Sequence, residues 1–504
     1  MVAPDPVDKQ SDPPIMQEDN FQALKAKSLA GIGSLIKRQV ATKVIYLVAT
    51  IILARLLTPQ SFGIYAIIAF MVQFFSTFGD VGLGAALIQK KESLSQEELA
   101  TTFWLQQALV WTVALIVFAL APFAKLIYPQ LPANAIWMLR VMVVAFVIAS
   151  LKTIPAILLE RDIRFDRIAQ VDVVESLSFY GFAVVFAWLG LDVWSFVYAA
   201  LARSILSVIT VYLISPWRPA RAFRFSCISE LVRFGVPYQG NNVLAFIKDA
   251  VTPLFVGTYA GPAAVGYVNW SRNFAFAPLM ISEAFGRVAF PAFSRIQDDK
   301  ELLARTIERS IRMMTLVMFP VTALMVALAP ELTHLVYTDK WLPGIPTFYY
   351  YCTSPAGIGV FLPLYIGILS LGNARIILLL VSGLVIFEWG IGVPCVMYFG
   401  FVGVAMTQPI TVSIFTFLYK VILAKNGVRV NLTRNILPQF IAAVLAGIAV
   451  KLLAIKLVVN FVILGALLLA GGVAYLLMLL AVKKDRVDEF VEYAKSIAGI
   501  GAKK

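Results

Sequence analysis

The sequence predicts an all-α polytopic membrane protein with about fourteen transmembrane helices, and two observations support this fold class. Hydrophobic residues make up 60% of the 504 positions and charged residues only 14%, whereas about a quarter of the residues in a soluble domain are charged. Apolar runs of about 20 residues follow one another, and each is long enough to cross the hydrocarbon core as a helix. Isolated strands are excluded, because their backbone polar groups would be unpaired in lipid.

The apolar runs and the segments between them divide the chain into six parts. The predicted parts, in order, are a disordered acidic tail, a basic amphipathic surface helix, six spans of a first lobe, six spans of a second lobe, two further spans and an amphipathic tail: residues 1–20, 21–38, 39–214, 229–424, 435–482 and 483–504. The first tail has no basic region followed by an apolar one, so it does not predict a signal peptide.

Lysine and arginine are distributed unevenly among the loops. One set of alternate loops is rich in them, as in the loop with Arg161, Arg164 and Arg167, whereas the other set holds three lysines and little else. The positive-inside rule places the rich set and both termini in the cytoplasm. The net charge of +13 is therefore explained by membrane topology, and no nucleic-acid partner is expected.

Short internal matches predict a repeat. A Pro-x-x-x-Gly turn begins at Pro59 and another at Pro262, 203 residues later, and the same offset places Asp80 on Glu283. Four such matches occur in the same order along the chain. They predict two six-helix lobes related by a parallel repeat, plus two C-terminal helices, with the solute site between the lobes.

Polar and charged side chains inside the predicted spans indicate a cavity, because such groups are costly in lipid and usually face water. The candidate cavity residues are Arg55, Asp80, Asn241, Lys248, Asp249, Arg272, Asn273 and Glu283. Arginine and lysine suit an anionic head group, and the amide side chains suit sugars. The alternative is structural, with Lys248–Asp249 and Arg272–Glu283 as internal ion pairs that hold helices together.

Three further carboxylates at membrane depth are candidates for coupling to H⁺ or Na⁺, namely Asp172, Glu175 and Glu388. Asp172 and Glu175 are three residues apart, so they would repel each other if both were ionised; pairing with Arg203 is the alternative. One histidine and three cysteines without a Cys-x-x-Cys pair predict neither a metal site nor a disulfide framework. No cofactor is expected.

Several motifs resemble those of a known transporter family. In chain order they are Ala54-Arg55-Leu56-Leu57-Thr58-Pro59 with Phe62, Gly63 and Tyr65; Phe78-Gly79-Asp80 with Gly82, Leu83, Gly84 and Ala86; Phe234-Gly235 with Pro237; Arg272 with Pro278; Arg287-Val288 with Phe290, Pro291, Phe293, Ser294 and Arg295; and Lys340-Trp341-Leu342-Pro343. Together they resemble the oligosaccharide flippase, or polysaccharide transporter, family of the multidrug/oligosaccharidyl-lipid/polysaccharide exporter superfamily.

The resemblance implies a flippase of the bacterial inner membrane. Such a protein moves undecaprenyl-pyrophosphate-linked oligosaccharide units from the cytoplasmic to the periplasmic leaflet by alternating access, for exopolysaccharide, capsule or O-antigen synthesis. It implies contact with membrane lipids, and a polysaccharide polymerase and a chain-length regulator as partners. Two departures are visible, because the family often has basic residues where this chain has Ala250 and Thr258. Lys248 and Arg272 are then left to supply positive charge.

Two other functions stay open from the sequence. A cation-coupled multidrug antiporter of the same superfamily usually has twelve spans, and the fourteen predicted here disfavour it. A membrane-embedded polysaccharide polymerase typically carries a long periplasmic loop with catalytic residues, and the predicted outer loops are short. The sequence therefore favours a transporter over an enzyme.

Overall fold

The computed structural model describes residues 42–79, 82–90, 92–224, 249–457 and 460–482, and individual positions between 228 and 247. These residues form helices and turns, with no strand among them. The tails and the surface helix predicted for 1–20, 21–38 and 483–504 lie outside the described residues.

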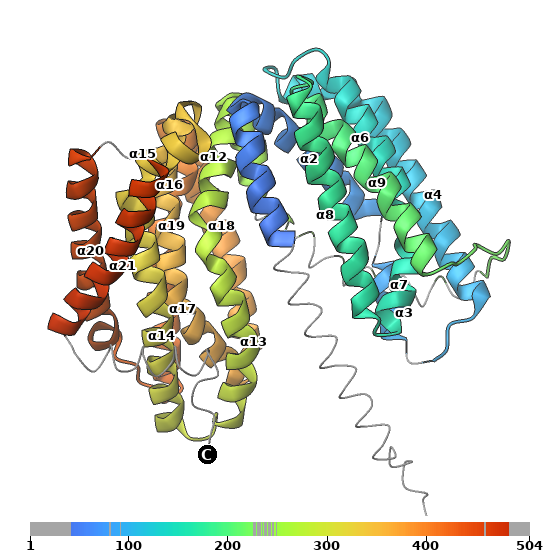
Figure 1. Cartoon of the computed structure of the whole chain (residues 1–504). Coiled ribbons are helices and arrows are strands. Elements are labelled where there is room, and N and C mark those ends of the chain that lie inside the picture. The colour runs from blue at the N-terminus through green and yellow to red at the C-terminus, as the bar shows by residue number, and fades with distance from the viewer. Residues whose placement is uncertain are drawn as a thin grey trace, which may run out of the picture.

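The helices fall into two bundles and a final pair (Figure 1). The first bundle contains a helical stretch over residues 42–56 and then α2 (Pro59–Gly79), α3 (Leu83–Gln89), α4 (Gln96–Leu120), α5 (Ala124–Ile127), α6 (Ala135–Ser150), α7 (Thr153–Arg161), α8 (Phe165–Trp188) and α9 (Trp194–Ile214). The second contains α11 (Gly257–Tyr259), α12 (Gly261–Ala275), α13 (Met280–Arg295), α14 (Lys300–Ala327), α15 (Ala329–Leu332), α16 (Ile345–Tyr351), α17 (Thr353–Ser370), α18 (Ala374–Phe399) and α19 (Gly403–Lys425). The pair is α20 (Leu432–Lys456) and α21 (Phe461–Val482).

The apolar helices make this a multi-pass membrane protein. Within the described residues, nine stretches are long and apolar enough to span a membrane, or ten if the bent pair α6–α7 is one span. One of the nine, Arg375–Lys425, covers α19 and all of α18 except its first residue. Of the apolar runs in the sequence, those at residues 39–57 and 229–257 are only partly described, and a 3₁₀ turn at Ala277–Leu279 divides the run at residues 263–290. The count of fourteen therefore stays a prediction.

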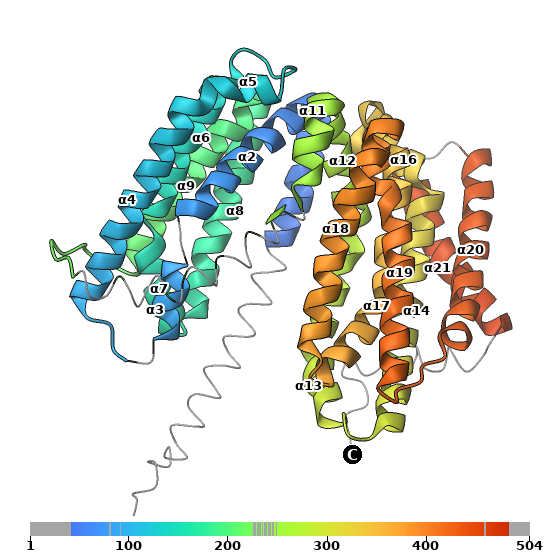
Figure 2. The same ribbon diagram turned by 180° about the vertical axis from the view of Figure 1, so that it is seen from behind.

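The two bundles meet at one end and diverge toward the other, as Figures 1 and 2 both show. At the first end, which we call the closed end, one buried apolar cluster runs through both bundles, from Leu53 and Ile64 to Val265 and Phe348. Toward the opposite end, each bundle has a core of its own. The core of the first bundle surrounds Leu87, and the second bundle has a separate cluster of buried apolar side chains. Among the described residues, the large apolar cluster that the two bundles share therefore lies at the closed end, where burial of apolar surface holds them together.

The two matched Pro-x-x-x-Gly turns contact each other at the closed end, where α2 packs on α12. A Cβ built on Gly63 would overlap the Pro262 carbonyl oxygen, and a Cβ built on Gly266 would overlap the Pro59 carbonyl oxygen. Only glycine allows two backbones to approach this closely. The contact is reciprocal, as a pair of two-fold related turns would make it, while the repeat over the rest of each lobe stays a prediction.

Two separate family motifs also meet at the closed end. The Trp341 indole, fully buried, donates from Nε1 to Ala54 O at 2.9 Å, and Lys340 Nζ donates to Arg55 O at 2.7 Å. The Arg55 guanidinium donates in turn to Leu335 O at 2.7 Å. The first helical stretch is thus tied by hydrogen bonds to the loop before α16.

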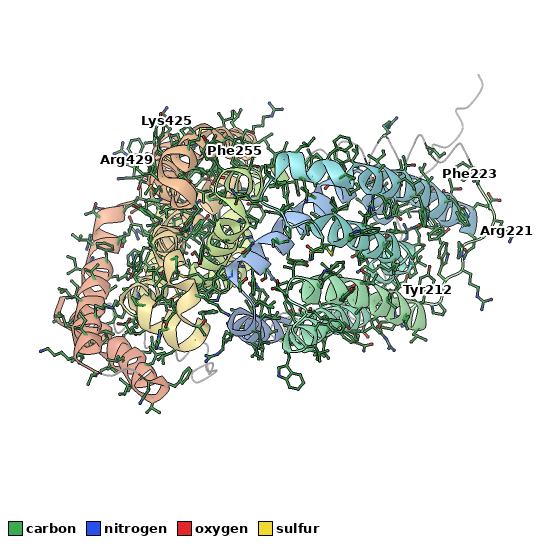
Figure 3. All side chains as sticks on the ribbon, turned by 90° about the horizontal axis from the view of Figure 1, so that it is seen from above. Tyr212, Arg221, Phe223, Phe255, Lys425 and Arg429 are labelled. Atoms are coloured by element: carbon green, nitrogen blue, oxygen red, sulfur yellow. The ribbon has the colours of Figure 1, made fainter. Side chains whose placement is uncertain are left out.

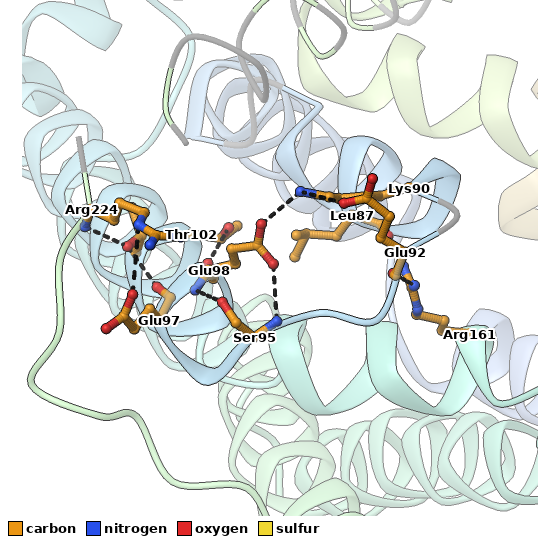
Figure 4. Close-up of polar contacts among 10 residues, drawn as sticks. Leu87, Lys90, Glu92, Ser95, Glu97, Glu98, Thr102, Arg161 and Arg224 are labelled. Atoms are coloured by element: carbon orange, nitrogen blue, oxygen red, sulfur yellow. Dashed lines mark hydrogen bonds and ion pairs between the residues drawn. The ribbon is translucent and has the colours of Figure 1, made fainter. Parts of the chain in front are cut away.

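The opposite end of the first bundle is ordered by polar contacts among its loops (Figure 4). Ser95 begins α4 with a capping box, in which its hydroxyl accepts from Glu98 N and the Glu98 carboxylate accepts from Ser95 N. Such reciprocal caps satisfy two unpaired backbone donors. Lys90 Nζ donates to Glu98 Oε1 at 2.6 Å, and Arg161 Nη1 donates to Leu87 O at 2.7 Å. These contacts join the C-terminal end of α3 to the first turn of α4 and to the end of α7.

The final pair lies on the side of the second bundle that faces away from the first (Figures 1 and 2). Gln439 of α20 accepts a hydrogen bond from the Thr315 hydroxyl and donates to Arg312 O at 3.2 Å, so α20 is bonded to α14 within the membrane. Seen from above (Figure 3), the molecule is elongated, with Arg221 and Phe223 at the far edge of the first bundle and Lys425 and Arg429 on the second. The pair therefore extends the second bundle and does not close the space between the bundles.

Candidate functional site

A polar cavity of about 560 Å³ lies in the half of the first bundle away from the closed end, on the side that faces the second bundle. We call it the first polar cavity. It is lined by Gln73, Ser76, Thr77, Gly79, Gln106, Val110, Phe146, Ala149, Ser150, Thr153, Gln239, Phe246 and Asp249. The last three belong to the segment that precedes α11 and the rest to α2, α4, α6 and α7. Gln239 Nε2 donates to Thr77 O at 2.7 Å, which joins that segment to α2. Both halves of the chain therefore contribute to one cavity.

A smaller polar cavity of about 140 Å³ continues into the second bundle, and we call it the second polar cavity. It is lined by Asp249, Val251, Thr252, Arg272, Phe276, Tyr351, Glu388, Val404, Thr407 and Gln408. Asp249 lines both polar cavities. The two cavities are therefore adjacent at Asp249.

Asp249 and Arg272 form an ion pair at this junction, with Arg272 Nη2 3.1 Å from Asp249 Oδ1. Asp249 lies three residues before a π-helical turn at Thr252–Val256 that contains Pro253, and such turns often occur at functional sites. Arg272 lies in the last turn of α12, where the helix dipole favours a cation. Its side chain is 37% exposed and that of Asp249 53%, so both are open to a solute in the cavity.

A third polar cavity, of about 520 Å³, lies within the first bundle. Its lining residues are Thr42, Tyr65, Asp172, Glu175, Ser176, Phe179, Tyr180 and Arg203. Glu175 is paired with Lys152 and accepts a hydrogen bond from the Ser207 hydroxyl, while Arg203 lies over the Phe179 ring at 5.3 Å. Asp172 and Glu175 thus share a cavity, and Glu175 forms its ion pair with Lys152 and not with Arg203.

The structure brings together some of the candidate residues and separates others. Asp249, Arg272 and Glu388 share the second polar cavity. Arg55 lies instead at the closed end, bonded to backbone carbonyls. Asn273 is exposed and is not among the residues that line these cavities.

The remaining candidates cannot be placed. Asp80, Asn241 and Lys248 lie outside the described residues, as does the side chain of Glu283. The ion pairs considered as the structural alternative therefore stay predictions, and the pair found for Arg272 is with Asp249, from the neighbouring span.

Several cavity residues were not singled out from the sequence. Gln106 of α4 donates to the Thr153 hydroxyl at 3.0 Å, and Gln107 donates to the Ser150 hydroxyl at 3.0 Å. Two adjacent glutamines inside an apolar run were the signal that could have identified this wall. Tyr351 of the second polar cavity gave no such signal, because tyrosine is also common in membrane helices.

In the part of the chain that the structure describes, no group of three or more His, Cys, Asp or Glu side chains is arranged to hold a metal ion.

Comparison with known proteins adds three relatives. The chain is 26% identical over 299 residues to the succinoglycan biosynthesis transport protein ExoT of Rhizobium meliloti (strain 1021), covering 58% of this chain and 59% of ExoT. It is 24% identical over 315 residues to the lipopolysaccharide biosynthesis protein WzxC of Escherichia coli (strain K12), covering 61% and 62%. It is 20% identical over 270 residues to the teichuronic acid biosynthesis protein TuaB of Bacillus subtilis (strain 168), covering 53% and 55%. The match thus spans less than two thirds of each relative.

Two solved structures share the fold. The lipid II flippase MurJ in an inward closed conformation aligns with a TM-score of 0.72 at 13% identity, over 90% of this chain and 100% of that one. An inward-facing multidrug resistance MATE transporter of the MOP superfamily aligns with a TM-score of 0.58 at 13% identity, over 76% and 95%.

The family itself is shown by a match to its sequence model. A model described as polysaccharide biosynthesis protein matches residues 52–346, which is more than half of the chain. The match includes the closed-end motifs, Asp249 and Arg272. The resemblance read from the motifs is confirmed, and this chain belongs to the polysaccharide biosynthesis protein family of membrane transporters.

Proposed function

We propose that this chain flips polyprenyl-pyrophosphate-linked oligosaccharides, with undecaprenyl as the polyprenyl group, from the cytoplasmic to the periplasmic leaflet of the bacterial inner membrane. The observation that carries the proposal is the junction of the two polar cavities at Asp249 and Arg272. A pyrophosphate and its sugars cannot enter lipid without a large cost in free energy. Polar walls from both halves of the chain replace water around such a head group, and Arg272 offers a planar cation for phosphate oxygens.

The arrangement of the two bundles supports alternating access. They share a core at the closed end and have separate cores at the opposite end. A motion that breaks the closed-end contacts and brings the opposite ends together would expose the same cavities to the other leaflet. The basic loops lie at the end away from the closed end, so we place that end, and both termini, in the cytoplasm.

Three features complete the proposal. Asp172, Glu175 and Glu388 are the candidates for binding a coupling H⁺ or Na⁺, and they line two different cavities. The oligosaccharide would pass to a polymerase and a chain-length regulator in the periplasm. The names of ExoT, WzxC and TuaB, which refer to succinoglycan, lipopolysaccharide and teichuronic acid, support a cell-surface polysaccharide as the product.

A reconstituted transport assay tests this function. The purified protein in vesicles is expected to move a fluorescent undecaprenyl-pyrophosphate-linked oligosaccharide out of reach of an external quencher, faster than protein-free vesicles do. Loss of the pyrophosphate from the substrate is expected to slow the movement. A rate equal to that of empty vesicles, together with uptake of a small organic cation, would instead support the multidrug antiporter.

A further inference from the structure

An apolar crevice of about 280 Å³ lies beside the first polar cavity, in the half of the first bundle nearer the closed end. Its lining residues are Phe70, Met71, Phe74, Phe75, Val117, Leu120, Phe123, Ala124, Ile127, Tyr128, Leu139 and Leu254. Every lining side chain is hydrocarbon apart from the Met71 sulfur and the Tyr128 hydroxyl. The crevice therefore offers no partner for a charged group or a sugar.

The crevice opens toward lipid and is closed at its depth. Leu120 is 46% exposed and Ile127 51%, on the surface of a membrane-spanning bundle. Tyr128 is 1% exposed and packs on Gly257. A hydrocarbon chain can therefore enter sideways from the bilayer and be enclosed on its inner side.

Three phenylalanine rings separate the crevice from the first polar cavity. Phe246 lines that cavity and stacks on Phe70, with the two ring centroids 4.9 Å apart. The centroid of the Phe74 ring lies 5.7 Å from that of Phe246. Phe70 and Phe74 line the crevice on the other side. A molecule with a polar head in the cavity and an apolar chain would pass these rings at the point where its polarity changes.

We propose that the crevice holds the first isoprene units of the polyprenyl chain while the head group occupies the polar cavities. This inference rests on the proposed function and adds the place where the lipid part binds. In a leaflet, the chain of a lipid points from its head toward the middle of the bilayer. The crevice lies on that side of the first polar cavity, further toward the closed end along α2 and α4. The geometry thus matches an amphiphile whose head group enters from the end opposite the closed end.

Photo-crosslinking tests the inference directly. A benzophenone amino acid at Leu120, which lines the crevice, is compared with one at Leu115, on the same helix and 65% exposed to lipid. Polyprenyl pyrophosphate in phosphatidylcholine vesicles is expected to label position 120 about tenfold more than position 115. Unlabelled polyprenyl pyrophosphate, but not added phosphatidylcholine, should compete. Equal labelling of both positions, or competition by phosphatidylcholine, would overturn the inference.

A filling substitution gives a second, independent measurement. Leu120→Trp is expected to slow transport of the undecaprenyl-linked oligosaccharide about tenfold, whereas Leu115→Trp should leave the rate unchanged. Equal rates in the two variants would also count against the crevice. If the wild-type protein transports its substrate but the benzophenone variant at position 120 is not labelled, only this inference fails. If that variant is labelled at position 120 but the wild-type protein transports nothing, the proposed function fails instead.

Discussion

Replacing Gly63 with alanine is expected to abolish most of the transport activity. A Cβ at this position would overlap the Pro262 carbonyl oxygen, and a backbone atom cannot move aside as a side chain can. Overpacking of this kind costs about 1–3 kcal/mol. It raises the free energy of the conformation in which the closed-end contact is formed. The population closed at this end should therefore fall about 5- to 150-fold, which stalls the cycle. Gly266→Ala should act in the same way, because the contact is reciprocal.

Gly181→Ala is the matched control for these two variants. Gly181 lies inside α8, and a Cβ there would meet nothing within 4 Å. The variant should transport at the wild-type rate in the vesicle assay, with equal amounts of folded protein. Wild-type transport by Gly63→Ala would show that the closed-end contact seen here is not needed for the cycle.

Replacing Arg272 with alanine is expected to slow transport about 10- to 100-fold, a loss of about 1.4–2.8 kcal/mol. The change removes the cation at the junction of the polar cavities and leaves the Asp249 carboxylate without this partner. Arg305→Ala is the control, because its pair with Glu301 lies on an exposed helix face, where ion pairs contribute little. The control should transport at the wild-type rate.

A charge exchange separates a ligand role of Arg272 from a structural one. The double variant Arg272→Asp with Asp249→Arg keeps an ion pair between the same two positions but moves the cation. If the pair only holds helices together, the exchange should restore transport relative to Arg272→Ala. If Arg272 contacts the pyrophosphate, the double variant should stay as slow as the single one. Full recovery would remove the head-group role.

Most of the architecture could be predicted from the sequence, because long apolar runs permit few structures in lipid. The all-helical fold and the family followed from such runs and from local motifs. The matching Pro59 and Pro262 turns predicted an internal repeat, but they did not predict that the two turns contact each other. It was less visible that the Ala54-Arg55 and Lys340-Trp341 motifs would bond to each other, since 285 residues separate Arg55 from Lys340.

The site was only partly predictable, since sequence spacing within one helix says little about which other helix faces it. Asp249 and Arg272 were both singled out, but their mutual pairing depends on how α12 lies against the preceding segment. Arg55 illustrates the opposite problem. A charge near the end of a span looks the same in sequence whether it lines a cavity or donates to carbonyls of a loop, and the structure shows the second arrangement.

Thiol accessibility tests the central claim, that the polar walls between the bundles form a path open to water. Ser76→Cys, in the first polar cavity, and Leu115→Cys, facing lipid, are made after Cys227, Cys352 and Cys395 have been replaced. A membrane-impermeant thiol reagent should modify the first variant from the end opposite the closed end, more slowly when undecaprenyl-pyrophosphate-linked oligosaccharide is present, and should not modify the second. A thiol at position 76 that reacts from neither face of the membrane would contradict the account.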